Sequence, residues 1–278
     1  MFWKRLISGI VLLAASFVLF YFGGAWLLAA IAALAVCGLY ELMRVFQMER
    51  HPFAIVVYVG ALAYFLMLLL QDLIWFFPHV WSVFILVVIF IILLTIFVLR
   101  FPKDSFLQVA QSAFALFYVA VLFSYIYQTR CLEQGRWFVW LIMIGSWGSD
   151  TCAYIVGVMF GKHHFSELSP KKTVEGCIGG VLGAALLGFL FALPFPDEGY
   201  MIWPAAVVFP IIGAVCALVS QVGDLAASAI KRNYKVKDYG TAIPGHGGIL
   251  DRYDSVLFAA PFVYYLLILF ASISVYVS

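Results

Sequence analysis

Charged side chains are scarce in this sequence. Asp, Glu, Lys and Arg make up 11% of its 278 residues, whereas a soluble domain carries about 25%. Hydrophobic residues account for 65%, and the mean hydropathy is +1.07. So little polar surface excludes an ordinary globular protein. Runs of about 20 apolar residues recur along the whole length, which predicts an all-α, polytopic integral membrane protein.

Several features of soluble enzymes are also missing. There is no GxxxxGK[ST] P-loop, no internal repeat and no soluble domain. The five cysteines have no metal-site spacing and four lie in apolar runs, so we interpret them as packing residues. The opening MFWKRLISGIVLLAASFVLFYF is similar to a signal peptide, but its apolar core is long and no clean cleavage site follows. We therefore expect a retained first span.

The apolar segments predict about nine transmembrane helices. Prolines and polar loops separate most of them. Only Gly23 and Gly24 separate the first two, which is consistent with either a tight hairpin or a broken helix. The expected helices are residues 6–22, 24–46, 54–71, 79–99, 105–128, 136–160, 174–194, 202–230 and 253–277.

The basic residues predict how these helices are oriented, because Lys and Arg stay on the cytoplasmic side. With nine spans and a cytoplasmic N-terminus, fourteen of the sixteen fall inside, and only Arg130 and Arg136 fall outside. We expect a multi-pass protein of a bacterial-type inner (plasma) membrane with its active site on the cytoplasmic face. Residues 1–130 are expected to form a bundle for lipid contact, dimerisation or substrate entry. Residues 131–278 are expected to be catalytic, with cytoplasmic loops 161–176 and 231–252.

Acidic side chains gather in the later helices. Asp224 lies near the inner end of the eighth helix, where an unpaired carboxylate is costly. Asp251 and Asp254 stand one turn apart at the start of the ninth helix, although capping that helix is an alternative role for Asp251. Asp150 lies within an apolar span, where a carboxylate either belongs to a functional site or forms a structural hydrogen bond between helices. Converging carboxylates make a hard-oxygen site that suits Mg²⁺.

Cations and glycines accompany these carboxylates between the last two helices. The basic residues there either mark topology or contact phosphate. Three glycines around His246 in PGHGG let backbone N–H groups approach an anion closely. Carboxylates, cations and a glycine turn together are the components of phosphoryl or nucleotidyl transfer.

The other long inner loop has similar chemistry. In SPKKTVEG, Lys171 and Lys172 precede a helix that Thr173 can cap, with Glu175 in its first turn. The glycines that follow predict close helix packing. Nearer the N-terminus, Glu41 is expected to pair with the arginine three residues later.

The stretch SAIKRNYKVKDYGTAIPGHGGILDRYD, residues 228–254, resembles the signature of the phosphatidate cytidylyltransferases, also called CDP-diacylglycerol synthases. Every defined position of that pattern is met, including Lys-Arg, Lys-Asp, His-Gly-Gly and the final Asp-Arg-apolar-Asp. The upstream DTCAYIVGVMFGKHHFSELSPKKTVEG is similar to a second region of the family. The resemblance covers roughly residues 145–255 closely, and the first five helices match only in kind.

This resemblance implies an enzyme that transfers CMP from CTP to phosphatidic acid of the inner leaflet, giving CDP-diacylglycerol and pyrophosphate. It also implies Mg²⁺, held by Asp224 and Asp251, with a second cation such as K⁺ beside it. The other implied catalytic residues, which would contact phosphate, are Lys231, Arg232, Lys237, His246 and Arg252. The implied substrate-binding residues are Lys171, Lys172, Thr173, Asp150, Ser228, Gly247, Gly248 and Asp254. Membrane lipids are expected partners and nucleic acid is not, while a homodimer stays open.

Two other functions compete with this interpretation. A different CTP-dependent lipid enzyme, such as a polyprenol kinase, would transfer the terminal phosphoryl group and release CDP. An ion-coupled transporter would use Asp150 and Asp224 as coupling-ion sites along a polar path through the membrane. The polar residues gather instead at one face, which favours the transferase.

Overall fold

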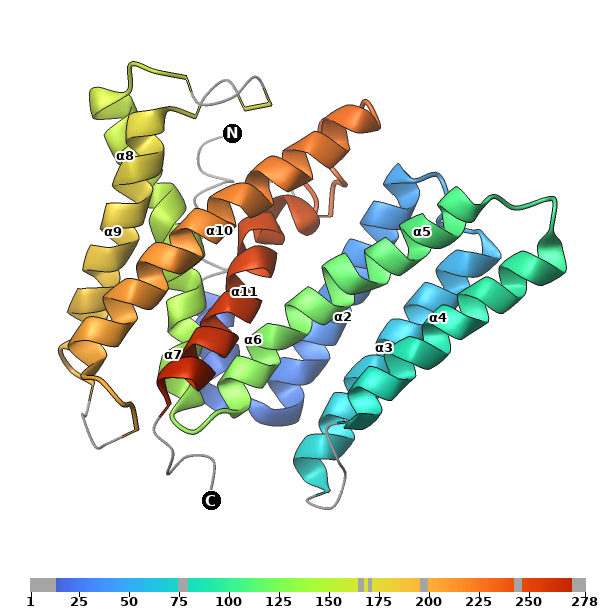
Figure 1. Ribbon diagram of the computed structural model, residues 1–278, viewed down its shortest axis with the longest axis horizontal. Helices are drawn as coiled ribbons and strands as arrows, with labels where there is room; N and C mark the ends of the chain where they lie inside the picture. The colour runs from blue at the N-terminus through green and yellow to red at the C-terminus, as the bar shows by residue number, and fades with distance from the viewer. Residues whose placement is uncertain are drawn as a thin grey trace. The chain divides into compact units, whose positions relative to one another are not determined.

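The computed structural model describes residues 14–74, 80–164, 168–169, 172–195, 200–242 and 247–271. Helices dominate this part of the chain (Figure 1), and it contains isolated β-bridges but no strand. Within these ranges, eight helical segments are long and apolar enough to cross a membrane. The all-α membrane fold expected from the sequence is therefore confirmed.

The eight segments begin and end within three residues of the last eight predicted helices, except that the last segment ends at Phe270 and residues 272–277 of the last predicted helix lie outside the described residues. The first predicted helix, 6–22, lies partly outside the described residues, although 14–22 are helical. The named helices are α2 (Gly24–Val45), α3 (Pro52–Leu73), α4 (Val80–Arg100), α5 (Phe106–Ala115), α6 (Leu122–Cys131), α7 (Gly135–Met143), α8 (Ser149–Phe160), α9 (Val174–Ala192), α10 (Ala205–Asn233) and α11 (Leu250–Phe270).

A break in the backbone separates residues 14–22 from α2. Gly23 and Gly24 adopt positive φ angles of 62° and 53°. Glycine reaches this left-handed region readily because it has no Cβ. The chain is thus interrupted where the two glycines predicted a boundary.

Two spans contain a π-helical turn. Leu116–Val121 joins α5 to α6, and Ile144–Gly148 joins α7 to α8. Each pair of helices therefore forms one crossing, Phe106–Cys131 or Gly135–Phe160. A π-turn shifts the register of the backbone hydrogen bonds and is frequent near functional sites.

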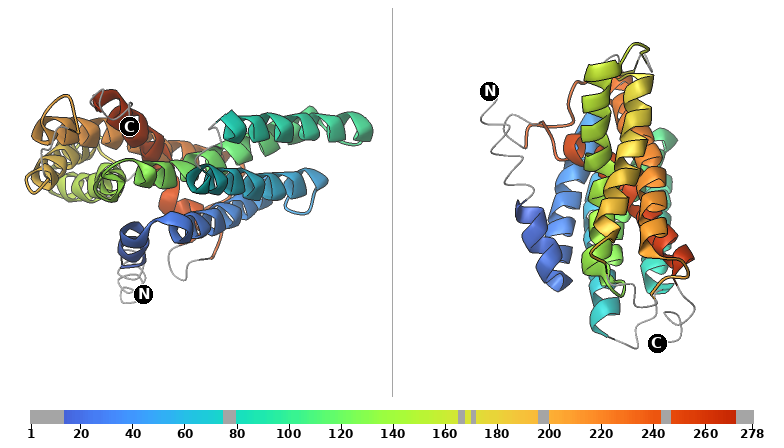
Figure 2. Two further views of the ribbon diagram at one scale, coloured as in Figure 1. Left: turned by 90° about the horizontal axis from the view of Figure 1, so that it is seen from below. Right: turned by 90° about the vertical axis from the view of Figure 1, so that its left-hand side faces the viewer.

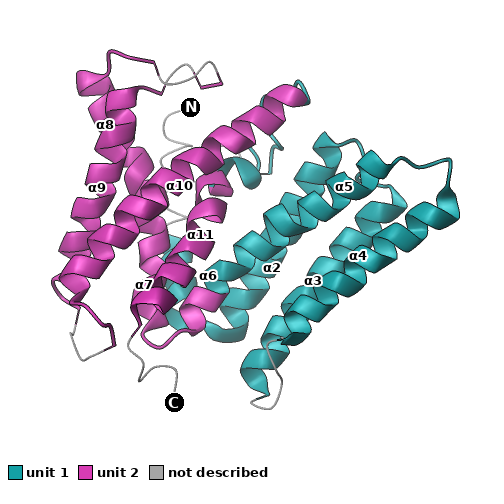
Figure 3. Ribbon diagram, viewed as in Figure 1, with its two compact units in different colours: residues 1–127, 234–252 teal, residues 128–233, 253–278 magenta. Residues whose placement is uncertain are grey.

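The chain divides into two compact units, coloured separately in Figure 3. Unit 1 comprises residues 1–127 and 234–252, and unit 2 comprises residues 128–233 and 253–278. The segment 234–252, which carries most of the signature, thus groups with the N-terminal helices. The functional division into an entry bundle and a catalytic region stays a prediction.

The core of unit 1 is built on α2 and α3. Leu39, Leu42 and Phe53 are completely buried between the helices of this unit. By contrast, α4 is apolar along almost its whole length, yet only Ile89 and Leu93 are buried. A helix that is apolar all round and largely uncovered is suited to contact lipid, because its backbone groups are bonded internally.

Unit 2 is built on α8, α9 and α10, which lie side by side in the right-hand view of Figure 2, with α9 packing against both neighbours. Glycines make the α8–α9 contact possible. A Cβ on Gly179 would lie 2.5 Å from Val156, and one on Gly176 would lie 2.8 Å from the carbonyl oxygen of Ala153. The close packing predicted from these glycines is confirmed.

Candidate functional site

Unit 2 brings together three of the carboxylates singled out in the sequence. Asp224 on α10 forms an ion pair with Lys172, which precedes α9. Asp224 also interacts electrostatically with Asp150 on α8 and with Asp254 on α11. Ser255 donates its hydroxyl hydrogen to Oδ2 of Asp150 at 3.3 Å. Four elements distant in sequence therefore converge on one acidic cluster, defined here as Asp150, Asp224 and Asp254.

The local charge of this acidic cluster is only partly compensated. Lys172 and Asp224 keep 24% and 28% of their side-chain surface, although the Nζ atom of Lys172 is itself buried. Asp254 is only 7% exposed and accepts the N–H of Ser255 at 2.8 Å. Lys231, in the last turn of α10, interacts electrostatically with Asp254. Three carboxylates thus face two lysines, which leaves an excess of oxygen donors that favours a cation.

The π-helical turn Ile144–Gly148 leads directly into the turn that carries Asp150. Ser220 of α10 donates its hydroxyl to the carbonyl oxygen of Gly145 at 3.1 Å. Ser146 donates to the carbonyl of Ile142 at 2.6 Å. These side chains satisfy carbonyl groups that the irregular turn affects, and so they fix where α8 begins.

A network of hydrogen bonds fixes the entry into α9, next to Lys172. Thr173 caps the helix by accepting the N–H of Gly176 at 3.1 Å, as the sequence predicted. Glu175 in the first turn accepts the N–H groups of Lys162 and His163 at 3.2 and 3.3 Å. The hydroxyl of Thr173 is therefore engaged in capping, and its role in substrate binding stays a prediction.

Unit 1 holds the other predicted metal ligand. Asp251 lies in the first turn of α11, and its Oδ2 accepts the N–H of Tyr239 at 2.8 Å and of Gly248 at 3.0 Å. Gly247 has a φ of 85°, which suits glycine and lets the chain turn toward Asp251. Both of these N–H groups precede α11, so the two contacts order the loop before the helix, and the capping role that the sequence left open for Asp251 stays a prediction.

Glu41 has a role that the sequence analysis missed. Its carboxylate accepts the N–H of Ile249 at 2.9 Å and that of Leu250 at 3.0 Å. Glu41 is 5% exposed and lies where the N-terminal end of α11 presents its unpaired N–H groups. The expected pair with Arg44 is wrong, because both carboxylate oxygens are committed to backbone at the start of α11. The signal that the sequence offered for this role was a single glutamate near the end of an apolar helix.

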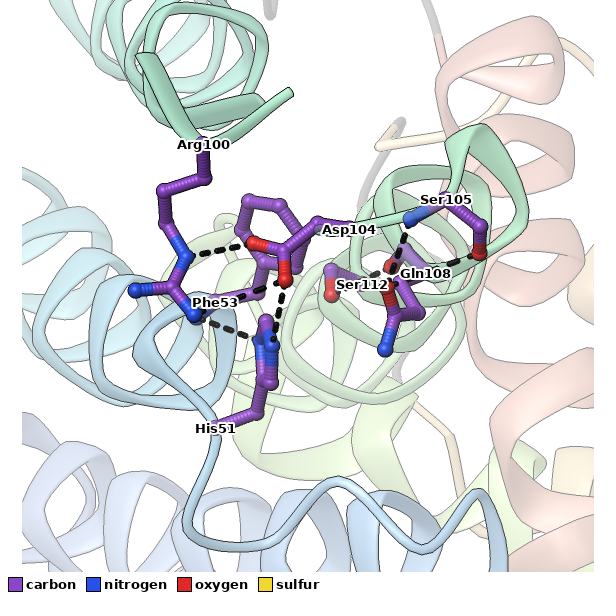
Figure 4. Close-up of polar contacts among 7 residues, drawn as sticks. All are labelled: His51, Phe53, Arg100, Asp104, Ser105, Gln108 and Ser112. Carbon is purple, nitrogen blue, oxygen red and sulfur yellow. Dashed lines mark hydrogen bonds and ion pairs between the residues drawn. The ribbon is translucent and has the colours of Figure 1, made fainter. Parts of the chain in front are cut away.

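A second polar group in unit 1 is shown in Figure 4. Asp104 accepts from Nε of Arg100 at 2.5 Å and lies 3.3 Å from Nε2 of His51. The side-chain hydrogen bond from Arg100 lowers the pKa of Asp104 below its usual range, although burial opposes this. Nδ1 of His51 accepts the N–H of Phe53 at 3.4 Å and caps α3. This group joins α3 to the loop between α4 and α5, and the sequence analysis did not anticipate it.

The remaining predicted site residues are distributed over both units. Lys231 and Arg232 belong to the last turn of α10, not to the predicted loop 231–252. The helix dipole favours cations at this end of a helix. Ser228 lies on the same helix. Lys237 and Arg252 are exposed in unit 1, where Gly248 is buried. Lys171 and His246 lie outside the described residues.

No group of three or more His, Cys, Asp or Glu side chains has metal-site geometry within the described residues. Carboxylate oxygens are nonetheless the ligands that Mg²⁺ uses, and the acidic cluster supplies them at a partly accessible position. The donor chemistry of unit 2 therefore fits a hard divalent cation.

Together these features define a polytopic membrane protein with an acidic cluster on one unit and a glycine-containing, basic loop on the other. The chain matches the family described as "Cytidylyltransferase family" over residues 3–270, and it belongs to that family.

Individual relatives agree with this assignment. The chain is 34% identical over 295 aligned positions to phosphatidate cytidylyltransferase of Synechocystis sp., covering 96% of each. It is 39% identical over 187 residues to phosphatidate cytidylyltransferase of Bacillus subtilis, covering 65% of this chain and 66% of that relative. The protein of that name from Staphylococcus saprophyticus is 39% identical over 178 residues, with 64% and 66% covered. The chain thus spans about two thirds of the Bacillus and Staphylococcus relatives in these matches.

Proposed function

We propose that this protein transfers the CMP group of CTP to phosphatidic acid, forming CDP-diacylglycerol and pyrophosphate. The observation that carries the proposal is the acidic cluster with Lys172, built from the segments that carry the family's motifs. The names of the relatives point to the same reaction.

The chemistry of the two substrates explains what such a site must do. The second pKa of a phosphomonoester is about 6, so phosphatidic acid is largely dianionic near neutral pH. One of its oxygens attacks the α-phosphorus of CTP, while the bond from that phosphorus to the β-phosphate oxygen breaks. The electron pair leaves with pyrophosphate, and no strong general base is required. Repulsion between the two polyanions is the main obstacle, so charge neutralisation and an in-line approach are what the protein must supply.

The residues proposed for neutralisation are cations of both units. Lys172 lies beside Asp224, and Lys231 and Arg232 lie at the end of the same helix. Lys171, Lys237, His246 and Arg252 complete the proposed set of phosphate contacts. His246 is proposed to contact an anion rather than to act as a base.

Asp224 and Asp251 are the residues proposed to hold Mg²⁺, with a second cation such as K⁺ beside it. When bound, Mg²⁺ would supply positive charge against the phosphate groups of CTP. The one oxygen of Asp251 that accepts two backbone N–H groups also orients its carboxylate. Asp150 and Asp254 are proposed to act at the substrate side of the acidic cluster.

The proposed location is the cytoplasmic face of an inner membrane, since the basic residues cluster at one set of loops. A homodimer is compatible with this arrangement. Phosphatidic acid would enter with its headgroup at loop level and its acyl chains in the bilayer.

The test uses purified protein with labelled CTP, phosphatidic acid and Mg²⁺. We expect a lipid-linked CMP and pyrophosphate in equal amounts, and loss of both in Asp224→Asn and Asp251→Asn proteins. Asparagine keeps an acceptor oxygen for the Asp251 loop contacts, so a fall in activity would report the lost charge. Glu133→Gln, an exposed position, is the matched control. Release of CDP with transfer of a single phosphoryl group would refute the proposal in favour of a kinase.

A further inference from the structure

A cavity of about 540 Å³ lies within unit 1, against residues 234–252, called here the signature segment. One wall is a single face of α2, with Cys37 and Arg44 separated by about two turns. Tyr58 of α3 forms part of another wall, and the loop Gly240–Ala242 closes a third. The volume lies in the range of small-molecule binding sites, about 300–1,000 Å³.

The walls of this cavity are mostly apolar, but they include unused polar groups. The hydroxyl of Tyr58 is buried and has no hydrogen-bond partner among the residues that the structure describes, which is costly unless a ligand supplies one. Arg44 is exposed, and no ion pair or hydrogen bond engages it within the described residues. The nearby carboxylate of Glu41 is committed to the N–H groups of Ile249 and Leu250. A cation and a hydroxyl at the edge of an apolar cavity complement an amphipathic anion.

We infer that this cavity binds phosphatidic acid, with the phosphate at Arg44 and Tyr58 and an acyl chain along the apolar wall. Two of its walls belong to helices that are long and apolar enough to cross a membrane, which suits a ligand that is itself part of the bilayer. Naming phosphatidic acid as the occupant rests on the proposed function. The shared chemistry, a phosphate monoester, also occurs in soluble molecules, and the experiment below separates the two sources.

The position of the cavity links lipid binding to the signature segment. Gly240 directly follows Tyr239, whose N–H is held by Asp251. Glu41 lines the cavity and also fixes the start of α11. A lipid seated here would therefore contact the same loop that is hydrogen-bonded to Asp251, a proposed metal ligand.

Cys37 provides a direct test that needs no catalysis. This exposed thiol lines the cavity, whereas Cys131 is exposed elsewhere and serves as an internal control. The rates of maleimide modification of both are measured by peptide mass spectrometry in the full-length protein without CTP. We expect phosphatidic acid to slow modification of Cys37 at least about fivefold and to leave Cys131 unchanged. Diacylglycerol lacks the phosphate and glycerol 3-phosphate lacks the acyl chains, so each should protect Cys37 from the maleimide weakly or not at all.

Substitutions test the polar contacts. Arg44→Gln should abolish the protection of Cys37 and raise the KM for phosphatidic acid about tenfold, because a charged hydrogen bond is lost. Tyr58→Phe should act in the same direction but less strongly. The KM for CTP should not change in either variant. Arg50→Gln, an exposed arginine that does not line the cavity, should behave as wild type in both assays.

The outcomes distinguish this inference from the proposed function. Wild-type protein that forms CDP-diacylglycerol but shows equal Cys37 rates with and without phosphatidic acid would overturn the cavity assignment alone. Equal protection by diacylglycerol would overturn phosphate recognition. Protection by glycerol 3-phosphate alone would assign the cavity to a soluble phosphate and overturn the lipid. Protection by phosphatidic acid without CDP-diacylglycerol synthesis would support the cavity and refute the reaction.

Discussion

Replacing Glu41 with alanine tests whether an N-terminal helix holds the signature segment in place. The carboxylate of Glu41 accepts two buried N–H groups, those of Ile249 and Leu250, at 2.9 and 3.0 Å. Each buried donor left without a partner costs about 1–3 kcal/mol, so the substitution should destabilise the start of α11 by about 2–6 kcal/mol. Even the lower bound corresponds to an increase of about 30-fold in the population of the opened segment.

Hydrogen exchange of the peptide covering residues 247–252 measures this opening directly. We expect these amides to exchange at least about 30-fold faster in Glu41→Ala than in wild type. Activity should fall as well, because Asp251 is part of the same turn. Glu133→Ala removes an exposed carboxylate elsewhere and should change exchange little. Unchanged exchange in Glu41→Ala would show that these two hydrogen bonds do not hold the segment, and the reasoning would be refuted.

Two further predictions concern the packing of each unit. The hydrogen bond from Arg100 lowers the pKa of Asp104. The ionised carboxylate of Asp104 therefore stabilises the fold above its unfolded pKa, about 3.9, and this stabilisation is lost as pH falls through the lower folded pKa. The difference in denaturation midpoint between wild type and Asp104→Asn should be constant above about pH 5 and shrink below about pH 4. Gly179→Leu should destabilise unit 2 by at least about 1–3 kcal/mol in detergent unfolding, since even a Cβ there would lie 2.5 Å from Val156.

Both of these predictions can fail clearly. A pH profile of Asp104→Asn parallel to that of wild type through the acid range would contradict the ionic role of this carboxylate. For the glycine, Leu182→Ala is the control, because Leu182 is on the same helix and its side chain is 66% exposed. Equal unfolding midpoints for Gly179→Leu and wild type would mean that α8 and α9 can separate at little cost.

The spans could be predicted because a membrane imposes simple rules on sequence. In the described part of the chain, eight apolar segments have the lengths that crossing requires, and their ends coincide with Pro52, Gly135 and other residues typical of helix ends. The π-helical turns could not be predicted in this way. Hydropathy is insensitive to one extra residue in a turn, so Ile144–Gly148 was assigned to a regular helix. One of its carbonyl groups, that of Gly145, accepts a hydrogen bond from Ser220 of another helix, which spacing along the sequence does not reveal.

The candidate site could be predicted in its residue types but not in its pairing. Asp150, Asp224 and Asp254 were recognisable as costly carboxylates, and the structure brings them together with Lys172. Which lysine would pair with Asp224 did not follow from spacing, because the two are 52 positions apart and meet only through helix packing. The roles of these residues in substrate and metal binding stay predictions.

The contacts of residues 234–252 show how the N-terminal helices hold this segment, although these helices carry no recognisable motif. Gln111 of α5 donates to the hydroxyl of Tyr234 at 2.6 Å, and Phe46, at the end of α2, packs on the same ring at 5.1 Å between centroids. With Glu41 at the other end of the segment, these residues hold both of its ends within unit 1. A loop of glycines and charged residues has little apolar surface with which to order itself. Its shape must therefore come from the helices beside it, so substitutions in α2 should impair the reaction without touching a phosphate.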